Sequence, residues 1–124
     1  MSIMRDWTIA DWTRAIAQNN RDKGWRDGIP ASFKGSELAQ FVAAQLMLIV
    51  SEAAEALEDV RAGNFAASTN PQNGKPEGLP SELADIVIRT LDLADMLGID
   101  LTRALEEKHS YNLGRAHRHG GKLL

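Results

Sequence analysis

Two pairs of carboxylates are the residues best suited to chemistry in this chain. Glu52 and Glu55 form the first pair, Glu82 and Asp85 form the second, and 26 residues separate the pairs. A spacing of three places both members of a pair on one face of a helix, about one turn apart. Hard divalent cations such as Mg²⁺ take carboxylate oxygens, and facing helices of a bundle can supply them. We therefore expect the two pairs to share a metal site.

A single pair would be weak support for a metal site. Aspartate and glutamate together account for 17 of the residues, and Glu55 and Glu58 repeat the same spacing without special context. The pattern becomes more specific because a face of cationic and amide side chains follows the second pair. Lys108, Asn112 and Arg115 recur at i, i+4 and i+7, so they share one face if a helix continues that far.

Two residues upstream of the carboxylates are candidates for contacting a ligand. Trp25 lies in a glycine-rich connection between residues 23 and 35, where a tryptophan is either a packing plug or a platform on which a base stacks. Gln45 lies two helical turns before Glu52, from where its amide can meet a base edge. A buried glutamine with satisfied hydrogen bonds is an equally good interpretation of Gln45.

The elements that must position these residues are helices. Residues 36–62 are apolar on every side for about three turns, which is typical of a helix surrounded by other helices. Ser36 is its expected N-cap. Further helices are expected over residues 8–22, starting after Thr8, over residues 80–97, and over residues 101–114, starting after Asp100. Trp12 and Ile16 should pack on the core helix.

The segments between and after these helices complete the expected domain. Residues 63–79 are rich in Pro, Gly and Asn, which predicts a long loop that serves as a lid or an oligomer contact. No stretch shows the alternation expected of a strand, and residues 115–124 read as a basic tail. The fold class expected is therefore all-α, a four-helix bundle around a central hydrophobic helix, in a single domain over residues 1–124.

Composition excludes several classes of protein. The chain has no cysteine, so thiol catalysis, iron–sulfur clusters and disulfide scaffolds are excluded. The start of the chain has no signal-peptide layout, and the longest apolar stretch falls short of the roughly 18 residues of a membrane span. We expect a soluble, cytoplasmic protein without a membrane partner.

Charge is distributed unevenly along the chain. Residues 1–102 carry 9 basic and 15 acidic side chains, whereas residues 103–124 carry 5 and 2. An acidic body argues against a nucleic acid polymer as partner and suits a small polyanion held between metal-binding carboxylates and a few cations. His117 and His119 form a His-x-His pair, which in a tail is more typical of a solvated segment than of a further metal site.

The combined motif resembles a known family. Glu52-x-x-Glu55, a spacer, Glu82-x-x-Asp85, the run from Lys108 through Asn112 to Arg115, and a His-Gly-Gly-Lys ending are similar to the MazG-like nucleoside triphosphate pyrophosphohydrolases of the all-α NTP pyrophosphatase superfamily. The resemblance covers roughly residues 36–122. The combination is specific, although no single piece of it is.

The resemblance implies an activity and a set of site residues. Members of the family cleave a (d)NTP between its α- and β-phosphates, releasing the monophosphate and pyrophosphate, and usually assemble as dimers or tetramers. Carried over to this chain, the four carboxylates bind Mg²⁺ or Mn²⁺, Lys108 and Asn112 contact phosphate or nucleotide, and Arg115 is a weaker candidate for a phosphate contact. Either Glu52 or Glu55 is the expected general base.

The base preference is left open by the sequence. Gln40, Phe41, Gln45 and Trp25 occupy the region where relatives differ according to the base they bind, and they identify none. A purine substrate such as (d)GTP is preferred slightly over dUTP or dCTP. Single-domain relatives of this size also occur in phages, where they trim a dNTP pool.

Two other classes of protein compete with this interpretation. A carboxylate-bridged di-iron bundle would need two Glu-x-x-His pairs, and the chain has only Glu106-x-x-His109. A non-catalytic helical module for nucleotide binding or oligomerisation would keep the fold without turnover. The intact set of carboxylates argues against this second alternative, because a degenerate site is expected to lose ligands.

Overall fold

The structure is a computed structural model that describes residues 3–116 and 118–124. A 3₁₀ turn, Ile3–Asp6, precedes α1, Ile9–Asp22, and α2, Gly35–Arg61. Two short strands follow, β1, Ser68–Thr69, and β2, Pro76–Glu77, and then α3, Leu79–Met96, α4, Leu101–Leu113, and α5, Arg118–Gly121. The mostly helical architecture confirms the all-α class. His117 lies outside the described residues, so the expectation for the His117 and His119 pair stays a prediction.

Local capping explains where two of the helices begin. The Thr8 side chain accepts a hydrogen bond from the Asp11 backbone N–H at 3.1 Å, and Asp11 Oδ2 accepts one from the Thr8 N–H at 2.8 Å. Asp100 accepts from the Arg103 N–H at 3.1 Å, as predicted. The prediction for Ser36 is wrong, because α2 begins one residue earlier and Lys34 takes the N-cap position without a side-chain hydrogen bond.

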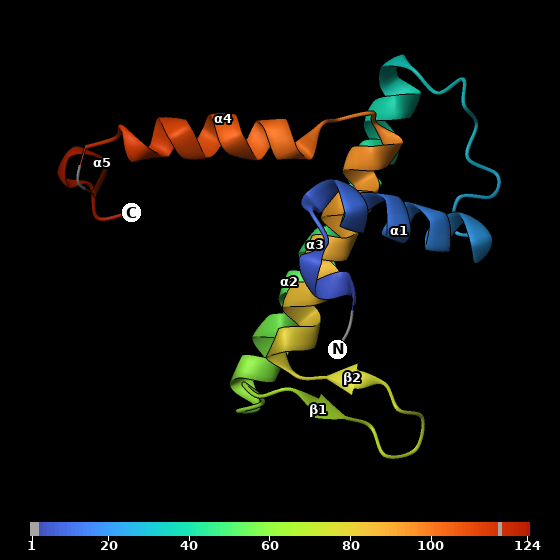
Figure 1. The fold of residues 1–124 in the computed structure, drawn as a ribbon, viewed down its shortest axis with the longest axis horizontal. Coiled ribbons are helices and arrows are strands. Elements are labelled where there is room, and N and C mark those ends of the chain that lie inside the picture. The colour runs from blue at the N-terminus through green and yellow to red at the C-terminus, as the bar shows by residue number, and fades with distance from the viewer. Residues whose placement is uncertain (1–2, 117) are drawn as a thin grey trace.

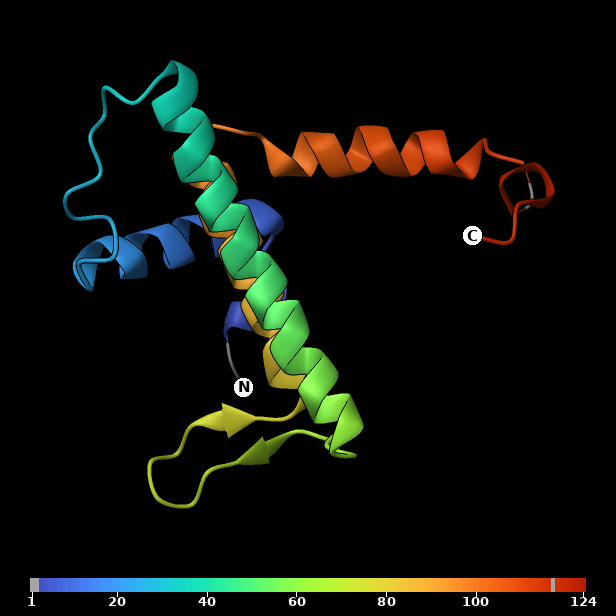
Figure 2. The same ribbon diagram turned by 180° about the vertical axis from the view of Figure 1, so that it is seen from behind.

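The helices form layers, with α3 between α1 and α2 (Figure 1). Figure 2 shows the opposite side, where α2 lies in front and runs alongside α3. The most buried apolar side chains outside α3 are Ala17 and Ala56, and α3 itself contributes Leu91, Leu93 and Ala94. The core therefore centres on α3. The helix α1, which carries Trp12 and Ile16, packs beside α3, so the predicted packing of these residues on α2 is not observed.

The apolar character of α2 is not matched by burial within this chain. Met47 is 61% exposed, Val50 53% and Leu57 57%, although all three are apolar residues of the expected core helix. The expectation that helices of the same chain surround α2 is therefore wrong. Among the described helices, α3 is the one that packs closely on α2. Phe33 of the preceding connection also meets Phe41, with 5.8 Å between the ring centres, while much of the remaining surface of α2 is exposed.

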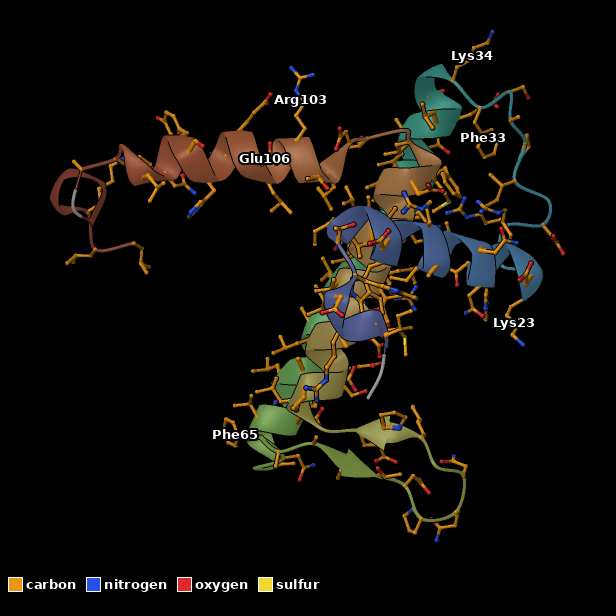
Figure 3. All side chains as sticks on the ribbon, in the orientation of Figure 1. Lys23, Phe33, Lys34, Phe65, Arg103 and Glu106 are labelled. Atoms are coloured by element: carbon orange, nitrogen blue, oxygen red, sulfur yellow. The ribbon has the colours of Figure 1, made fainter. Side chains whose placement is uncertain are left out.

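The helix α4 does not close a bundle around α2 and α3. It runs off to one side after the connection Leu97–Asp100, and α5 lies at its far end (Figures 1 and 2). All residues of α4 after Leu101 are exposed. Figure 3 shows Arg103 projecting from this helix away from the rest of the molecule.

A short hairpin replaces the predicted loop between α2 and α3. Ser68 pairs with Glu77 and Thr69 with Pro76 in an antiparallel ladder, which the sequence did not indicate because each strand has only two residues. Gly78 joins β2 to α3 with a φ of +95°, and a Cβ at this position would lie 2.3 Å from the backbone oxygen of Ala66. Glycine is therefore required where the hairpin meets α3.

By length and hydropathy alone, α2 also passes the test for a helix that can cross a membrane, with a mean hydropathy of 1.3 over an 18-residue window. A mostly buried core helix of a soluble protein passes the same test, whereas only 6% of this window is buried within the chain. The expected cytoplasmic location therefore stays a prediction.

Candidate functional site

Three of the four predicted carboxylates converge where α2 lies along α3. Glu52 comes from α2, Glu82 and Asp85 come from α3, and one oxygen of each lies within 4.8 Å of the others. The close packing of the two helices brings the carboxylate pairs together, as their shared spacing predicted. Glu55 is exposed and adjoins Glu82, but it is outside this group of three.

Two oxygens of this carboxylate cluster, Glu52, Glu82 and Asp85, are buried without a hydrogen-bond partner. The Glu52 side chain is only 9% exposed, and its Oε2 has no partner. The Oε2 of Glu82 is also buried and has no hydrogen-bond partner. Burying a carboxylate oxygen is costly unless a cation or a proton compensates it. Oxygen ligands of this kind fit a hard divalent cation such as Mg²⁺ or Mn²⁺, and they fit a soft or nitrogen-preferring metal poorly.

The pKa values of the three carboxylates are shifted in different directions. Burial raises the pKa of Glu82 to about 7, and hydrogen bonding and charge from Glu55 act in the same direction. Burial and the charge of Glu52 raise the pKa of Asp85, although Arg89 and Lys75 oppose the rise. The hydrogen bond from Arg89 lowers the pKa of Glu52. A divalent cation would reverse the upward shifts, because it favours the ionised carboxylates.

Arg89 is a site residue that the sequence analysis did not select. Its Nε donates a hydrogen bond to Glu52 Oε1 at 2.7 Å. The sequence places Arg89 four residues after Asp85 and therefore on the same face of the helix, which is the pattern that could have identified it. A polar stripe of this kind usually faces solvent, so spacing alone did not separate Arg89 from an ordinary surface arginine.

A cavity of about 480 Å³ adjoins the cluster. Both upstream candidates, Trp25 and Gln45, line it together with Glu52 and Asp85, so four predicted residues meet in one cavity. The other side chains of its wall are a mixture of polar and apolar groups, Asn20, Arg26, Ile29, Leu48, Ile88, Arg89, Asp92 and Met96. The cavity thus has a carboxylate end on α2 and α3 and an aromatic wall from the connection after α1.

Trp25 is fixed from both sides although its side chain is 77% exposed. Gly24, with a φ of +81°, ends α1, and the backbone N–H of Trp25 donates to the Asn20 oxygen at 3.0 Å. On the other side, the Arg26 guanidinium donates to Asp95 Oδ2 at 3.0 Å and to Asp92. Trp25 is therefore an exposed indole on an anchored backbone, an arrangement that suits stacking on a planar ligand.

The three predicted residues near the C-terminus do not reach the carboxylate cluster in this chain. Lys108 and Asn112 lie on α4, which leads away from α2 and α3, and Arg115 follows the end of that helix at Leu113. Lys108 Nζ lies 5.3 Å from the centre of the Tyr111 ring, and the Arg115 guanidinium carbon lies 5.8 Å from it. These residues form a separate exposed basic group around Tyr111.

Comparison with known protein families, curated proteins and solved structures finds no match to this chain. The functional interpretation therefore depends on the carboxylate cluster, on the cavity beside it and on the sequence motif to which the carboxylates belong.

Proposed function

We propose that this protein is a metal-dependent nucleoside triphosphate pyrophosphohydrolase, which converts a (d)NTP to the monophosphate and pyrophosphate. The observation that carries the proposal is the pair of buried, unpartnered oxygens on Glu52 and Glu82, in a cluster whose Glu52 and Asp85 line a cavity of about 480 Å³. Cavities of some hundreds of Å³ are typical of sites for ligands the size of a nucleotide. The proposal agrees with the MazG-like motif of the sequence.

The carboxylate cluster would hold Mg²⁺ or Mn²⁺, with Glu55 adjoining it. A divalent cation held there would stabilise the charge of a phosphate chain and would lower the pKa of a bound water. The hydrogen bond from Arg89 lowers the pKa of Glu52. Glu52 therefore stays ionised and is a poor proton acceptor. We therefore assign the general base to Glu55, which lies at the exposed edge of the cluster.

The proposed reaction transfers a nucleotidyl or pyrophosphoryl group to water. The water oxygen forms a bond to phosphorus, the bridging P–O bond between the α- and β-phosphates breaks, and the water proton passes to Glu55. The products are the monophosphate and pyrophosphate. Trp25 offers its indole face to the base, and the amides of Asn20 and Gln45 lie in the same cavity wall as donors and acceptors for a base edge. A purine, as in (d)GTP, is the base that we favour.

The protein is proposed to act as a homodimer or homotetramer. The thirteen residues of α4 have almost no packing in this chain, and an isolated helix of that length is marginal in water. The exposed apolar side chains of α2 also form a surface of the kind that usually binds another protein surface. A second copy of the chain would cover α2 and would give α4 a surface to pack on. The charges favour such a contact, because residues 103–124 carry 5 basic and 2 acidic side chains and the rest of the chain is acidic. Such an assembly would also complete the four-helix arrangement around α2.

A panel of common NTPs and dNTPs, including dUTP and dCTP, tests the activity. Each nucleotide is incubated with the protein and Mg²⁺, and the monophosphate, diphosphate, pyrophosphate and phosphate are separated by chromatography. We expect monophosphate and pyrophosphate, with (d)GTP among the best substrates, and no turnover by Glu55→Gln. Glu58→Gln is the matched control, because Glu58 lies three residues further along α2 with a side chain that is 69% exposed.

Either of two outcomes would overturn the proposal. Absence of turnover across the panel would favour the non-catalytic nucleotide-binding module. Formation of diphosphate and phosphate would show cleavage at a different bond and would reject the pyrophosphohydrolase assignment.

A further inference from the structure

The guanidinium of Arg89 has more hydrogen-bonding capacity than its contacts use. It carries five N–H donors, and only the Nε–H is engaged, with Glu52 Oε1 at 2.7 Å. Within the part of the chain that the structure describes, its two Nη groups have no hydrogen-bond partner. The side chain is 40% exposed and lines the cavity together with Glu52 and Asp85.

The other arginine of the cavity wall is already committed. Arg26 donates from both Nη groups, to Asp95 and to Asp92, and its Nε is buried. Arg26 therefore anchors the connection after α1, and its side chain is only 17% exposed, against 40% for Arg89. Arg89 is the arginine of this wall that keeps a free pair of donors beside the carboxylate cluster.

We propose that Arg89 binds the phosphate chain of the nucleotide through its Nη groups while its Nε stays on Glu52, a role that rests on the proposed function. The planar guanidinium matches the geometry of two phosphate oxygens, and Glu52 fixes its orientation. Arg89 thus supplies within the chain the cationic contact that the sequence analysis assigned to Lys108 and Arg115. It is a substrate-binding residue beside the metal ligands.

A purely structural role for Arg89 makes a different prediction. If Arg89 only neutralised Glu52, its removal would disturb the metal ligands and would weaken the binding of Mg²⁺ and of phosphates together. If Arg89 binds phosphate, its removal weakens phosphate binding, while Mg²⁺ alone binds as well as before or more tightly, because a neighbouring positive charge is gone.

Calorimetry on the full chain at pH 8 separates these two roles. The titrants are Mg²⁺ alone, inorganic pyrophosphate in saturating Mg²⁺, and the α,β-methylene analogue of dGTP in saturating Mg²⁺. For Arg89→Gln we expect the affinity for both phosphate probes to fall roughly tenfold or more, the usual loss for a hydrogen bond to a charged group. Arg89→Lys should fall between wild type and Arg89→Gln, because its single ammonium cannot hold Glu52 and span two phosphate oxygens at once.

Arg61→Gln is the matched control. Arg61 is also a helix arginine paired with a glutamate, Glu58, at 3.3 Å, but its side chain is 71% exposed. It should bind all three titrants like the wild type.

The outcomes distinguish this inference from the proposed function. Wild-type binding of the phosphate probes with equal binding by Arg89→Gln would refute the role of Arg89 alone. A parallel loss of Mg²⁺ and phosphate binding in Arg89→Gln would also refute it, in favour of the structural role. A wild-type protein that binds neither phosphate probe in Mg²⁺ would reject the proposed function itself.

Discussion

Binding of Mg²⁺ at pH 7 should release about half a proton from Glu82. The buried position of this side chain beside Glu55 raises its pKa to about 7, so close to half of the metal-free molecules carry the proton at that pH. A carboxylate must be ionised to ligate a metal, so binding expels the proton. From Glu82 alone we expect about 0.9 proton released at pH 6 and about 0.1 at pH 8.

The direction of the pH dependence follows from the sign of each shift. Glu82 and Asp85 have raised pKa values, so both add to proton release as the pH falls, whereas the lowered pKa of Glu52 keeps it ionised. Protons and Mg²⁺ compete for the cluster. The apparent affinity for Mg²⁺ should therefore weaken as the pH falls below 7, approaching about tenfold per pH unit for a single competing proton.

Isothermal titration calorimetry measures this proton release directly. Mg²⁺ is titrated at pH 6, 7 and 8 in pairs of buffers with different ionisation enthalpies, and the dependence of the observed enthalpy on the buffer gives the number of protons. Glu82→Gln removes the titrating group, so any binding that remains should release almost no proton at pH 7. Glu58→Gln should match the wild type. Binding of Mg²⁺ with little release at every pH would refute the reasoning.

Further predictions concern the core, the hairpin and the bare side of α2. Leu91→Ala removes a side chain that is 4% exposed and should lower the free energy of unfolding by about 2–5 kcal/mol in denaturant titrations. Leu113→Ala, at 74% exposed, should change it by less than about 0.5 kcal/mol. Gly78→Ala should lower the thermal midpoint more than Gly74→Ala, because only the former adds a collision with a backbone oxygen. Met47→Asp, on the exposed side of α2, should shift the protein toward the monomer in light scattering.

These predictions fail in distinct ways. Equal losses for the two leucines would show that the core does not centre on α3. Equal midpoints for the two glycine variants would remove the argument for close packing at Gly78. An unchanged mass for Met47→Asp, or a wild-type protein that is already monomeric, would contradict the proposed cover of α2 by a second copy.

The secondary structure was largely predictable because its signals are local. Thr8 and Asp100 cap helices as expected, and the expected spans of all four long helices are close to those observed. The capping side chains compete for backbone donors within three residues, so sequence neighbours decide the outcome. The hairpin was missed because a ladder of two residues per strand is too short to show alternation.

The packing was less predictable because it depends on partners distant in the sequence. The apolar run from residue 40 to residue 50 indicates that α2 must be covered, but it does not say whether by the same chain or by another. The helix that lies between α1 and α2 is α3, and the sequence did not indicate that it takes this central place. A connection of a few residues after α3 directs α4 away, and no sequence period reports that direction.

The parts of the candidate site that depend on spacing along a helix were easier to predict than those that depend on tertiary packing. Three of the four carboxylates expected to share a site, Glu52, Glu82 and Asp85, lie close together because α2 packs on α3, whereas Glu55 lies outside this group. Trp25 and Gln45 line one cavity together with Glu52 and Asp85. The placement of Lys108 next to the carboxylates depended on the tertiary path of α4, and in this chain that path leads elsewhere. Arg89 was passed over because its contact with Glu52 joins two helices 37 residues apart in sequence.

The most direct measurement is the anomalous diffraction of Mn²⁺ in crystals grown with the α,β-methylene analogue of dGTP. We predict a manganese peak among the oxygens of Glu52, Glu82 and Asp85, with the base against Trp25 and the phosphates next to Arg89. Manganese bound only elsewhere on the molecule, or a nucleotide bound away from this cavity, would contradict it.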